Sequence, residues 1–259
     1  MRKIFDKIFN KKQDPIAEKY QTISVDTDKV RDTKFNVYNN IERVRTEQFG
    51  NEREALDFFI NTIEDGDIVL DVGASVGLFS VVSAKYPNTQ IVYSFEPDAE
   101  TYNRLNENIQ LNELSNVKSF QKALSDKKGV TKLYTDGTNG FAPTLVFQKN
   151  REGAPSQVIE IQTEALDNFI QDSVIEVPDN IKVDIEGAEI LFLKGARKTL
   201  AGSFGKKPRS IFLEIHPEFL PDFDSSDDEV RSILLENGYE LIWESGRETQ
   251  IHTHWIAKD

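Results

Sequence analysis

Two short stretches of the sequence end in side chains that can exchange a proton. Asp184 and Glu186 end the run IKVDIE, and Glu214 and His216 end the run IFLEIH. Alternate residues of a strand point to the same face, so each pair would project from one side of its strand. If the strands are neighbours, three carboxylates and an imidazole converge there. A general base at this place would be His216 or Asp184, unless His216 only fixes the turn at Pro217.

The same residues could instead hold a hard cation such as Mg²⁺, which prefers oxygen ligands. The sequence does not decide between these alternatives, and we favour the one without a metal. Glu189 would either contact the substrate or orient Lys182 or Lys194. His252 and His254 could form half of a zinc site, but we expect a solvent-facing edge strand. Cysteine is absent, which excludes disulfides and thiolate chemistry.

A glycine-containing bend lies between the predicted strand IVLD and the helix that follows. Asp71, Gly73, Ser75 and Gly77 give the spacing D-x-G-x-x-x-G. Glycine lets the backbone approach a ligand and leaves amides at a helix N-terminus facing it. Ser75 breaks the dinucleotide fingerprint G-x-G-x-x-G, and the phosphate loop G-x-x-x-x-G-K-[ST] is absent. The alternative is that the glycines only form a turn.

A carboxylate at the end of the next predicted strand narrows the class of ligand. Glu96 follows Asp71 by 25 residues (96 − 71). A carboxylate at this place can accept hydrogen bonds from both ribose hydroxyls of an adenosine and would repel a 2′-phosphate. We therefore predict an adenosine ligand, and S-adenosyl-L-methionine fits. Its amino-acid tail would lie over the bend, where Asp71 would orient the bend or bind the ammonium group.

The elements that would position these residues alternate between strand and helix. Short apolar runs and amphipathic segments follow one another from Asn51 to Gly238, which indicates parallel βαβ units. YELIWES and IHTHWIAK, joined through a turn at Gly246, are expected to close the sheet as an antiparallel pair. We predict an α/β, Rossmann-like fold with a mostly parallel twisted sheet and a C-terminal antiparallel hairpin.

Two segments depart from this alternation. Residues 1–50 are expected to be an N-terminal extension, and residues 51–259 one domain. Within that domain, residues 126–165 indicate two hairpin-like strands around a polar loop, which is typical of a lid but also of a disordered loop. The aromatic residues of this region that could stack on a sugar ring, or only fill a core, are Tyr134, Phe141 and Phe147.

Composition limits the partners. The chain has 259 residues and a net charge of −13, so we expect no nucleic-acid partner. Residues 1–12 carry five basic and one acidic side chain in an amphipathic pattern. They could contact an anionic membrane surface weakly, although a helix packed on its own domain or a frayed terminus is preferred. No secretory signal pattern and no transmembrane run is evident, and we expect a cytoplasmic protein.

Five motifs between Asn51 and Gly238 resemble the FkbM family of S-adenosylmethionine-dependent methyltransferases. They are DVGASVG, FEP at 95–97, ALSD at 123–126, KVDIEGAE at 182–189 and LEIH at 213–216. The resemblance implies a class I methyltransferase fold and methylation of a hydroxyl oxygen, often on a sugar or a natural product. It also implies cofactor contacts at Glu52, Ala123 and Leu124. Ser75 stands where the family generally has asparagine, with one contact fewer.

We therefore expect an O-methyltransferase that uses S-adenosyl-L-methionine and acts on a hydroxyl of a small-molecule or glycan acceptor. Methyl transfer from a sulfonium is an in-line displacement, so the protein mainly positions the acceptor oxygen and supplies a base. The alternative is a catalytically silent scaffold that binds the cofactor or a partner protein. An adenine-dinucleotide dehydrogenase is a third hypothesis, which Ser75 disfavours.

Overall fold

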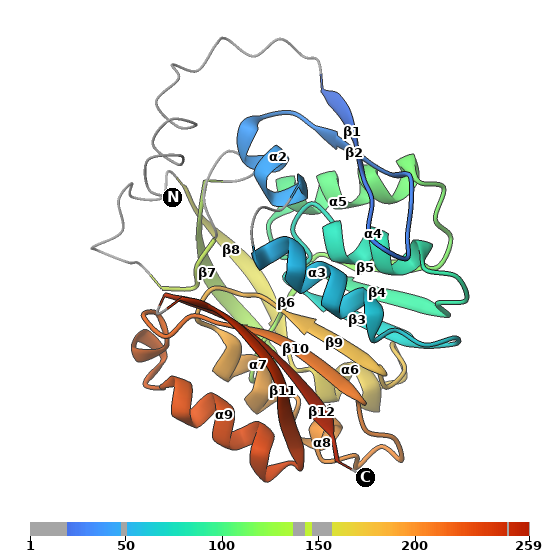
Figure 1. The fold of residues 1–259 in the computed structure, drawn as a ribbon. Helices are drawn as coiled ribbons and strands as arrows, with labels where there is room; N and C mark the ends of the chain where they lie inside the picture. The colour runs from blue at the N-terminus through green and yellow to red at the C-terminus, as the bar shows by residue number, and fades with distance from the viewer. Residues whose placement is uncertain (1–19, 48–50, 137–142, 147–156, 248, 259) are drawn as a thin grey trace.

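The computed structural model describes residues 20–47, 51–136, 143–146, 157–247 and 249–258 (Figure 1). The predicted basic helix at residues 1–12 lies outside this part of the chain, as do Phe141 and Phe147. The helix that contains Glu52 is described, but the side chain of Glu52 is not. Within the described residues, no helix combines the length and the apolar character needed to cross a membrane.

A seven-stranded sheet forms the centre of the molecule, in the order β11-β12-β10-β9-β3-β4-β5. Its strands are β3 (Ile68–Val72), β4 (Ile91–Phe95), β5 (Val117–Phe120), β9 (Asn180–Val183), β10 (Ser210–Ile215), β11 (Tyr239–Arg247) and β12 (Gln250–Ala257). β5, β4, β3, β9 and β10 run parallel, whereas β12 is antiparallel to both β10 and β11. The predicted mostly parallel sheet with a C-terminal antiparallel hairpin is therefore confirmed.

Two details of the hairpin differ from the expectation. Gly246 is not in the turn: it pairs with Ile251 inside the ladder, and the pairing continues to Arg247 and Gln250. β12 is also not an edge strand, because it lies between β10 and β11. Alternation along a strand reveals which residues share a face, but it does not reveal how many neighbours the strand has.

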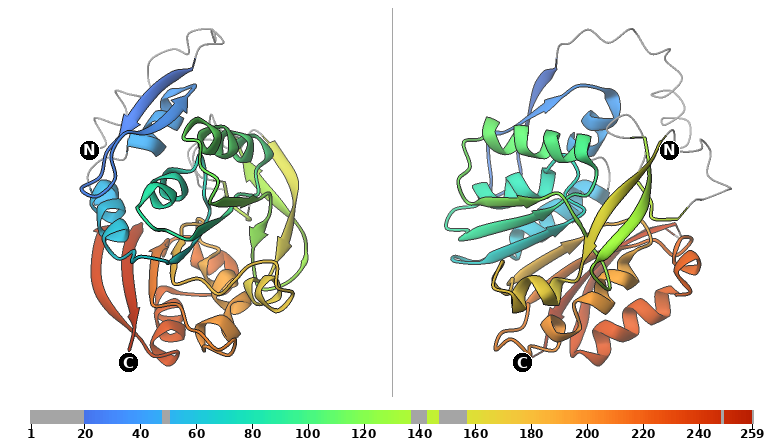
Figure 2. Two further views of the ribbon diagram at one scale, coloured as in Figure 1. Left: turned by 90° about the vertical axis from the view of Figure 1, so that its right-hand side faces the viewer. Right: turned by 180° about the vertical axis from the view of Figure 1, so that it is seen from behind.

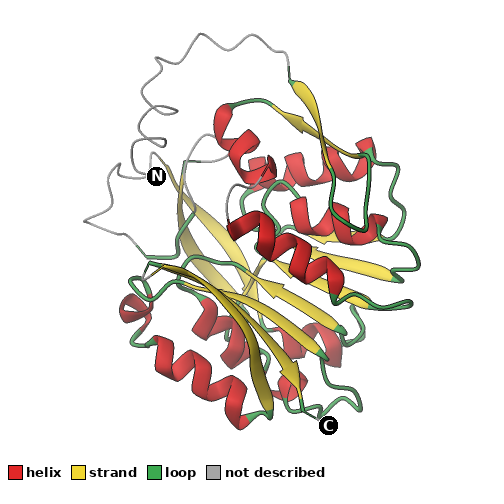
Figure 3. Ribbon diagram, viewed as in Figure 1, coloured by secondary structure: helices red, strands yellow, loops and turns green. Residues whose placement is uncertain are grey.

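Helices cover both faces of this sheet (Figures 2 and 3). They are α3 (Asn51–Asn61), α4 (Leu78–Lys85) and α5 (Ala99–Leu111) on one face, and α6 (Leu166–Gln171), α7 (Glu189–Gly195), α8 (Arg197–Leu200) and α9 (Asp227–Glu236) on the other. Successive residues of β3 alternate between the two cores: Val69 packs in one, and Leu70 packs in the other. This burial on both sides explains why the parallel strands are almost continuously apolar.

The described part of the N-terminal extension packs against α5. β1 (Gln21–Val25) and β2 (Thr33–Val37) form a separate antiparallel pair. The amide of Asn36 donates to Asn108 Oδ1 at 2.9 Å, and the amide of Lys34 donates to Asn112 Oδ1 at 2.9 Å. The next element, α2 (Asn40–Glu47), is thereby held near the carboxyl ends of the central strands (Figure 1).

A small third sheet lies beside the central one, in the order β6-β8-β7. Its strands are β6 (Ala123–Leu124), β7 (Gly129–Thr135) and β8 (Gln157–Glu164). β7 and β8 are antiparallel, and β6 runs parallel to β8. The end of β7 is extended by a bridge between Tyr134 and Thr144. This sheet brings side chains of β6, β7 and Leu145 to the same cavity as the central strands.

Candidate active site

A cavity of about 340 Å³ lies at the carboxyl ends of β3, β4, β9 and β10. The strand order reverses there, because β4 lies on one side of β3 and β9 on the other. In open α/β sheets such a reversal is the usual place for a ligand, since the flanking connections leave on opposite faces. The walls come from the glycine bend, Glu96, the ends of β9 and β10, the small sheet and α2.

The glycine bend forms one wall of the cavity through Ala74, Ser75 and Val76. Gly73 has a φ of +76°, and a Cβ there would lie 2.0 Å from the carbonyl oxygen of Asp184. Gly77 has a φ of +97° and is the N-cap residue of α4. Both positions therefore need glycine for space and for backbone conformation. The turn hypothesis and the binding hypothesis are both compatible with this geometry, because the bend is tight and also faces the cavity.

Glu96 lies at the end of β4 and lines the cavity, although only 4% of its surface is exposed. Its two carboxylate oxygens accept hydrogen bonds from the amides of Ser75 and Asp98, each at 2.9 Å. Burial raises the pKa of Glu96 to about 7, and these two hydrogen bonds and the charge of Arg45 oppose the rise only in part. The carboxylate therefore links the bend to β4 and titrates near neutral pH.

Asp71 does not line the cavity. It is fully buried, where it accepts a hydrogen bond from Ser80 Oγ at 2.6 Å and lies 3.3 Å from Lys182 Nζ. Lys182 in turn donates to the carbonyl oxygen of Gly73 at 2.8 Å. Of the two roles predicted for Asp71, orienting the bend fits this position, whereas direct contact with a ligand's ammonium group does not. Lys182 supplies the connection, which the sequence analysis did not assign to it.

Two further cofactor contacts that the resemblance implied belong to β6. Ala123 and Leu124 of β6 line the cavity, together with Lys122. They approach it because Leu124 pairs with Glu164 in the small sheet. An adenosine with its ribose at Glu96 would have an apolar surface here for its base.

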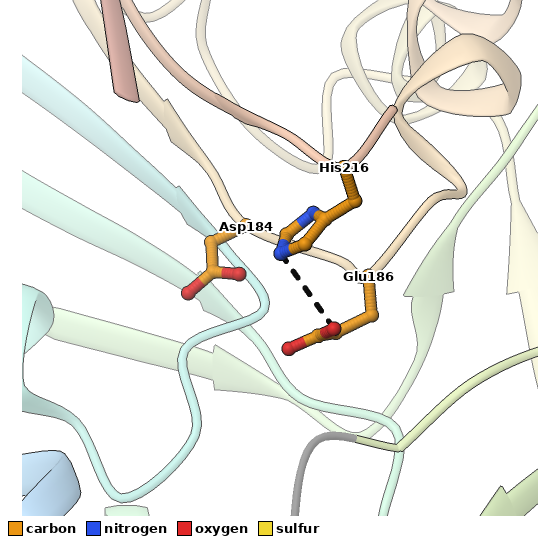
Figure 4. A group of neighbouring side chains, drawn as sticks. All are labelled: Asp184, Glu186 and His216. Carbon is orange, nitrogen blue, oxygen red and sulfur yellow. Dashed lines mark ion pairs between the residues drawn. The ribbon is translucent and has the colours of Figure 1, made fainter. Parts of the chain in front are cut away.

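Asp184, Glu186 and Glu214 form the acidic wall of the cavity, at the ends of β9 and β10. The two strands are neighbours, so the predicted convergence occurs. His216 belongs to the same group but does not line the cavity. Its Nε2 lies 3.3 Å from Glu214 Oε1. The same nitrogen lies 3.6 Å from Glu186 Oε2 (Figure 4).

Glu189 contacts the ring nitrogen of His216 that is not directed at the acidic wall. Its Oε1 lies 2.8 Å from Nδ1 of the imidazole, and the same oxygen accepts a hydrogen bond from the amide of Gly187 at 2.8 Å. Glu189 therefore orients the histidine and not a lysine, which corrects one of its predicted roles. Lys182 pairs with Asp71, and Lys194 pairs with Glu229 at 3.4 Å.

The charges and burial around His216 and Asp184 raise the pKa of both, with different consequences for proton transfer. Burial opposes the charge of His216, but Glu186, Glu189 and Glu214 outweigh it and raise its pKa well above the usual value. Burial, and then the charge of Glu214, raises the pKa of Asp184. An imidazole that already holds its proton is a poor base, whereas a carboxylate with a raised pKa is a better one. Of the two predicted bases, the geometry favours Asp184, whose side chain is 34% exposed.

Glu214 is the counterpart of Asp184 on the neighbouring strand. Burial would raise its pKa, but hydrogen bonds from His216 and His252 outweigh burial and lower it. His252 Nε2 lies 3.0 Å from Glu214 Oε2. The carboxylate of Glu214 therefore stays ionised between two imidazoles. It is suited to pair with these rings and not to take up a proton.

The expectation of solvent-facing histidines on β12 is wrong. His252 is 3% exposed and lines the cavity, and His254 is fully buried with its Nε2 2.6 Å from Ser210 Oγ. Phe212 packs against both histidines, and Phe58 of α3 packs against His254, so this face of β12 is covered. The two histidines have different partners, and they are not part of the metal-type cluster that the described residues contain, which consists of Asp184, Glu186 and His216.

Arg45 is the main cavity residue that sequence reasoning missed. It lies on α2, which also contributes Ile41 and Val44 to the wall. Its charge interacts with those of Glu96 and Glu186, which both line the cavity. No motif marks Arg45, because it reaches the site only through the packing of β2 and α2 on the domain. The available signal was the apolar spacing of Ile41 and Val44, with a basic residue on each side of Val44.

Comparison with known proteins decides the family. Residues 71–241 match the family described as Methyltransferase FkbM domain, which is well over half of the chain. The chain belongs to this family. The domain is that of an S-adenosylmethionine-dependent methyltransferase, and its sheet has the Rossmann-like fold of that class. The resemblance drawn from the five motifs is therefore confirmed.

Three curated relatives illustrate the range of this family. Methyltransferase sdnD of Sordaria araneosa is 29% identical over 52% of this chain and 62% of its own length. Hexuronic acid methyltransferase AglP of Haloferax volcanii is 24% identical over 71% of this chain and 70% of its own. The 31-O-demethyl-FK506 methyltransferase FkbM of Streptomyces tacrolimicus is 25% identical over 73% and 80%. The match thus spans about three fifths of the Sordaria protein.

Likeness to solved structures is more distant. The precorrin-6y C5,15-methyltransferase of Geobacter metallireducens aligns over 82% of this chain and 92% of that chain, with 12% identity and a TM-score of 0.48. A likeness of this degree says nothing about which residues bind a ligand.

Proposed function

We propose that this FkbM-family methyltransferase transfers a methyl group to a hydroxyl oxygen of a sugar, a glycan or a natural-product-type small molecule. One observation carries the proposal. A single cavity has Glu96 and the glycine bend in one wall and Asp184, Glu186 and Glu214 in another. A nucleoside-binding carboxylate and a proton-accepting group therefore face the same space, as transfer between two bound molecules requires.

The residues present fit S-adenosyl-L-methionine, which when bound supplies an electrophilic methyl group on sulfur. Glu96 would accept hydrogen bonds from the ribose hydroxyls. Ala123 and Leu124 would contact the base, and the backbone of the bend would lie along the amino-acid tail. The clash that a Cβ at Gly73 would make with Asp184 supports this fit, because it shows how closely the bend approaches the acceptor side.

The acidic wall would position the acceptor. We infer that Asp184 accepts a hydrogen bond from the acceptor hydroxyl and takes its proton during or after attack, since burial and Glu214 raise the pKa of Asp184. Lys182, 3.7 Å from Asp184, would stabilise the ionised form between turnovers. Glu189 and His216 are positioning residues in this scheme, because they hold the wall but do not line the cavity.

The names of two relatives support a hydroxylated acceptor. One acts on hexuronic acid, which is a sugar acid, and the other on a 31-O-demethyl natural product. The small sheet beside the cavity, with Leu133, Pro143 and Leu145, offers an apolar surface on which such an acceptor could rest.

The test is methyl transfer from isotopically labelled S-adenosylmethionine to a panel of sugars, uronic acids and hydroxylated natural products. We expect transfer to at least one class, with kcat reduced at least about a hundredfold in Asp184→Asn, the usual scale for loss of a general base. The matched control is Asp126→Asn, a carboxylate outside the cavity. S-adenosylhomocysteine binding without transfer to any acceptor would support the silent-scaffold alternative, and no binding at high micromolar ligand would contradict the cofactor assignment.

A further inference from the structure

We propose that Asp184, Glu186 and His216 bind one divalent metal ion at the acceptor side of the cavity. The proposal adds an ion to the site proposed above and deepens that function, on which its catalytic meaning rests. Two of the residues follow β9 and the third follows β10 (Figure 4). Two carboxylates and one imidazole are ligand types that first-row divalent ions accept.

The geometry of the three side chains suits an ion. One potential ligand atom from each residue lies within 4.8 Å of the others. Ligands on opposite sides of a small divalent ion are about 4 Å apart, at metal–ligand distances of about 2.1 Å. The bound of 4.8 Å exceeds this value, so the side chains would move inward to coordinate an ion. Asp184 and Glu186 are partly exposed to the cavity, so both an ion and its water ligands can enter.

His216 is held as metal-binding histidines usually are. Its Nδ1 pairs with Glu189 Oε1 at 2.8 Å, which fixes the ring and directs Nε2 toward Glu186. Metal-ligating histidines typically donate their other ring N–H to a carboxylate, because this sets the tautomer and raises the basicity of the ligating nitrogen. Glu189 is itself fixed by the amide of Gly187. A histidine kept only for packing would not need this support from a fully buried carboxylate.

A second, independent observation is the excess of acceptor atoms. Three carboxylates, Glu186, Glu189 and Glu214, share the imidazole of His216 at distances of 2.8 to 3.6 Å. Glu189 is fully buried, and its Oε2 has no hydrogen-bond partner within the described part of the chain. Buried carboxylates are costly unless they are paired or coordinate a metal. The three carboxylates compete for one ring, and a dication beside them would supply positive charge that the imidazole of His216 alone does not.

The donor set indicates the kind of ion. Two carboxylate oxygens and one imidazole nitrogen, without a thiolate, suit a first-row divalent ion such as Mn²⁺ better than Ca²⁺, which prefers oxygen ligands alone. Water or the acceptor's own oxygen atoms would complete the coordination. A bound ion would orient an acceptor hydroxyl and lower its pKa. Asp184 has two carboxylate oxygens, so one can ligate the ion while the other accepts the proton.

The experiment is a titration of the full chain with Mn²⁺, in which electron paramagnetic resonance measures the concentration of the free ion at each step. We expect one saturable site per chain. His216→Gln and Asp184→Asn should weaken Mn²⁺ at least tenfold, and Glu189→Gln should weaken it by about ten- to a hundredfold through loss of the support. Glu240→Gln, an exposed carboxylate on β11, should bind Mn²⁺ as the wild type does. Competition with Mg²⁺, Ca²⁺ and Zn²⁺ ranks the ions.

Circular dichroism and S-adenosylhomocysteine calorimetry on the same samples show that each variant is folded and binds the cofactor product. Wild-type protein that binds S-adenosylhomocysteine but shows no saturable Mn²⁺ site below about 1 mM would overturn the metal proposal and leave the proposed function standing. The metal proposal would also be overturned if His216→Gln bound Mn²⁺ as tightly as the wild type does. It would be overturned as well if saturating S-adenosylhomocysteine abolished Mn²⁺ binding, because the carboxylates would then bind a different ligand. Failure of S-adenosylhomocysteine itself to bind would count against the proposed function.

Discussion

Oε1 of Glu189 lies 2.8 Å from Nδ1 of His216, and both side chains are buried. A histidine held in this way has a fixed ring and one nitrogen directed at the acidic wall. It does not face the cavity, and neighbouring carboxylates raise its pKa. In the proposed function, Glu189 thus fixes the imidazole of His216 beside the acidic wall, and Asp184 is the exposed group that would meet an acceptor.

Cofactor binding should depend on pH through Glu96. The ionised carboxylate is the better acceptor for ribose hydroxyls, and its pKa in the folded protein is about 7. We expect the affinity for S-adenosylhomocysteine to fall as the pH is lowered from 8 to 6, and protons to be released on binding near pH 7. Calorimetry in buffers of different ionisation enthalpy measures both. In Glu96→Gln the affinity should be lower and independent of pH, and a variant that kept the wild-type profile would contradict this assignment.

The free energy of unfolding should also depend on pH through Glu96, but it should fall as the pH rises, whereas cofactor affinity should increase. The pKa of Glu96 is raised on folding above its usual value of 4.5, so the native state retains a proton that the unfolded state has released. Between about pH 4.5 and 7 the contribution of Glu96 to the free energy of unfolding must decrease as the pH rises. The difference in unfolding free energy between Glu96→Gln and wild type should therefore grow in favour of the variant over this interval. A constant difference, measured by urea denaturation, would count against a raised pKa.

Gly73→Ala should damage both stability and cofactor binding. The new Cβ would lie 2.0 Å from the carbonyl oxygen of Asp184, at a positive φ. We expect a loss of more than about 3 kcal/mol in the free energy of unfolding, since overpacking and strain add. The control is Gly66→Ala, which has a φ of +86° but no atom within 4 Å of the new Cβ. It should cost only about 1 kcal/mol. Equal losses would mean that space at Gly73 is not limiting.

Lys182→Met should destabilise the fold because it leaves Asp71 buried without its cation. The side chains of Lys182 and Asp71 are 5% and 1% exposed. Removing one partner of a buried pair costs about 3–5 kcal/mol. The double variant Asp71→Asn with Lys182→Met should recover part of this loss. Lys258→Met, from an exposed pair with Glu240, should change the unfolding free energy by less than about 0.5 kcal/mol. An effect of Lys182→Met as small as that of Lys258→Met would be inconsistent with the pairing.

Arg45→Met should weaken cofactor binding, although Arg45 lies outside residues 71–241, which match the family. The positive charge lowers the pKa of Glu96, so its loss favours the protonated carboxylate. We expect S-adenosylhomocysteine to bind about threefold more weakly at pH 7, equivalent to about 0.6 kcal/mol, since Arg45 is the smallest of the influences on Glu96. Arg43→Met is the matched control, because Arg43 lies on the same helix but pairs with Glu47 and does not line the cavity. If both variants bind S-adenosylhomocysteine equally well, α2 forms part of the cavity wall but its charge does not affect cofactor binding.

Local sequence patterns predict the alternation of strands and helices, the glycine bend and the place of Glu96, and they put Asp184, Glu186, Glu214 and His216 at two strand ends, whose adjacency only the sheet order establishes. These features follow from local periodicity and from the rule that parallel strands end at one edge of a sheet, so neighbouring residues suffice to predict them.

The tertiary structure decided the rest. It paired Glu189 with His216, placed β12 inside the sheet so that His252 faces Glu214, and brought Arg45 over the cavity. It also turned Asp71 away from the cavity, toward Lys182. Each of these depends on contacts between segments far apart in the chain. Spacing within one segment carries no information about which distant segment packs against it, and that packing sets burial, charge and therefore the role of each residue.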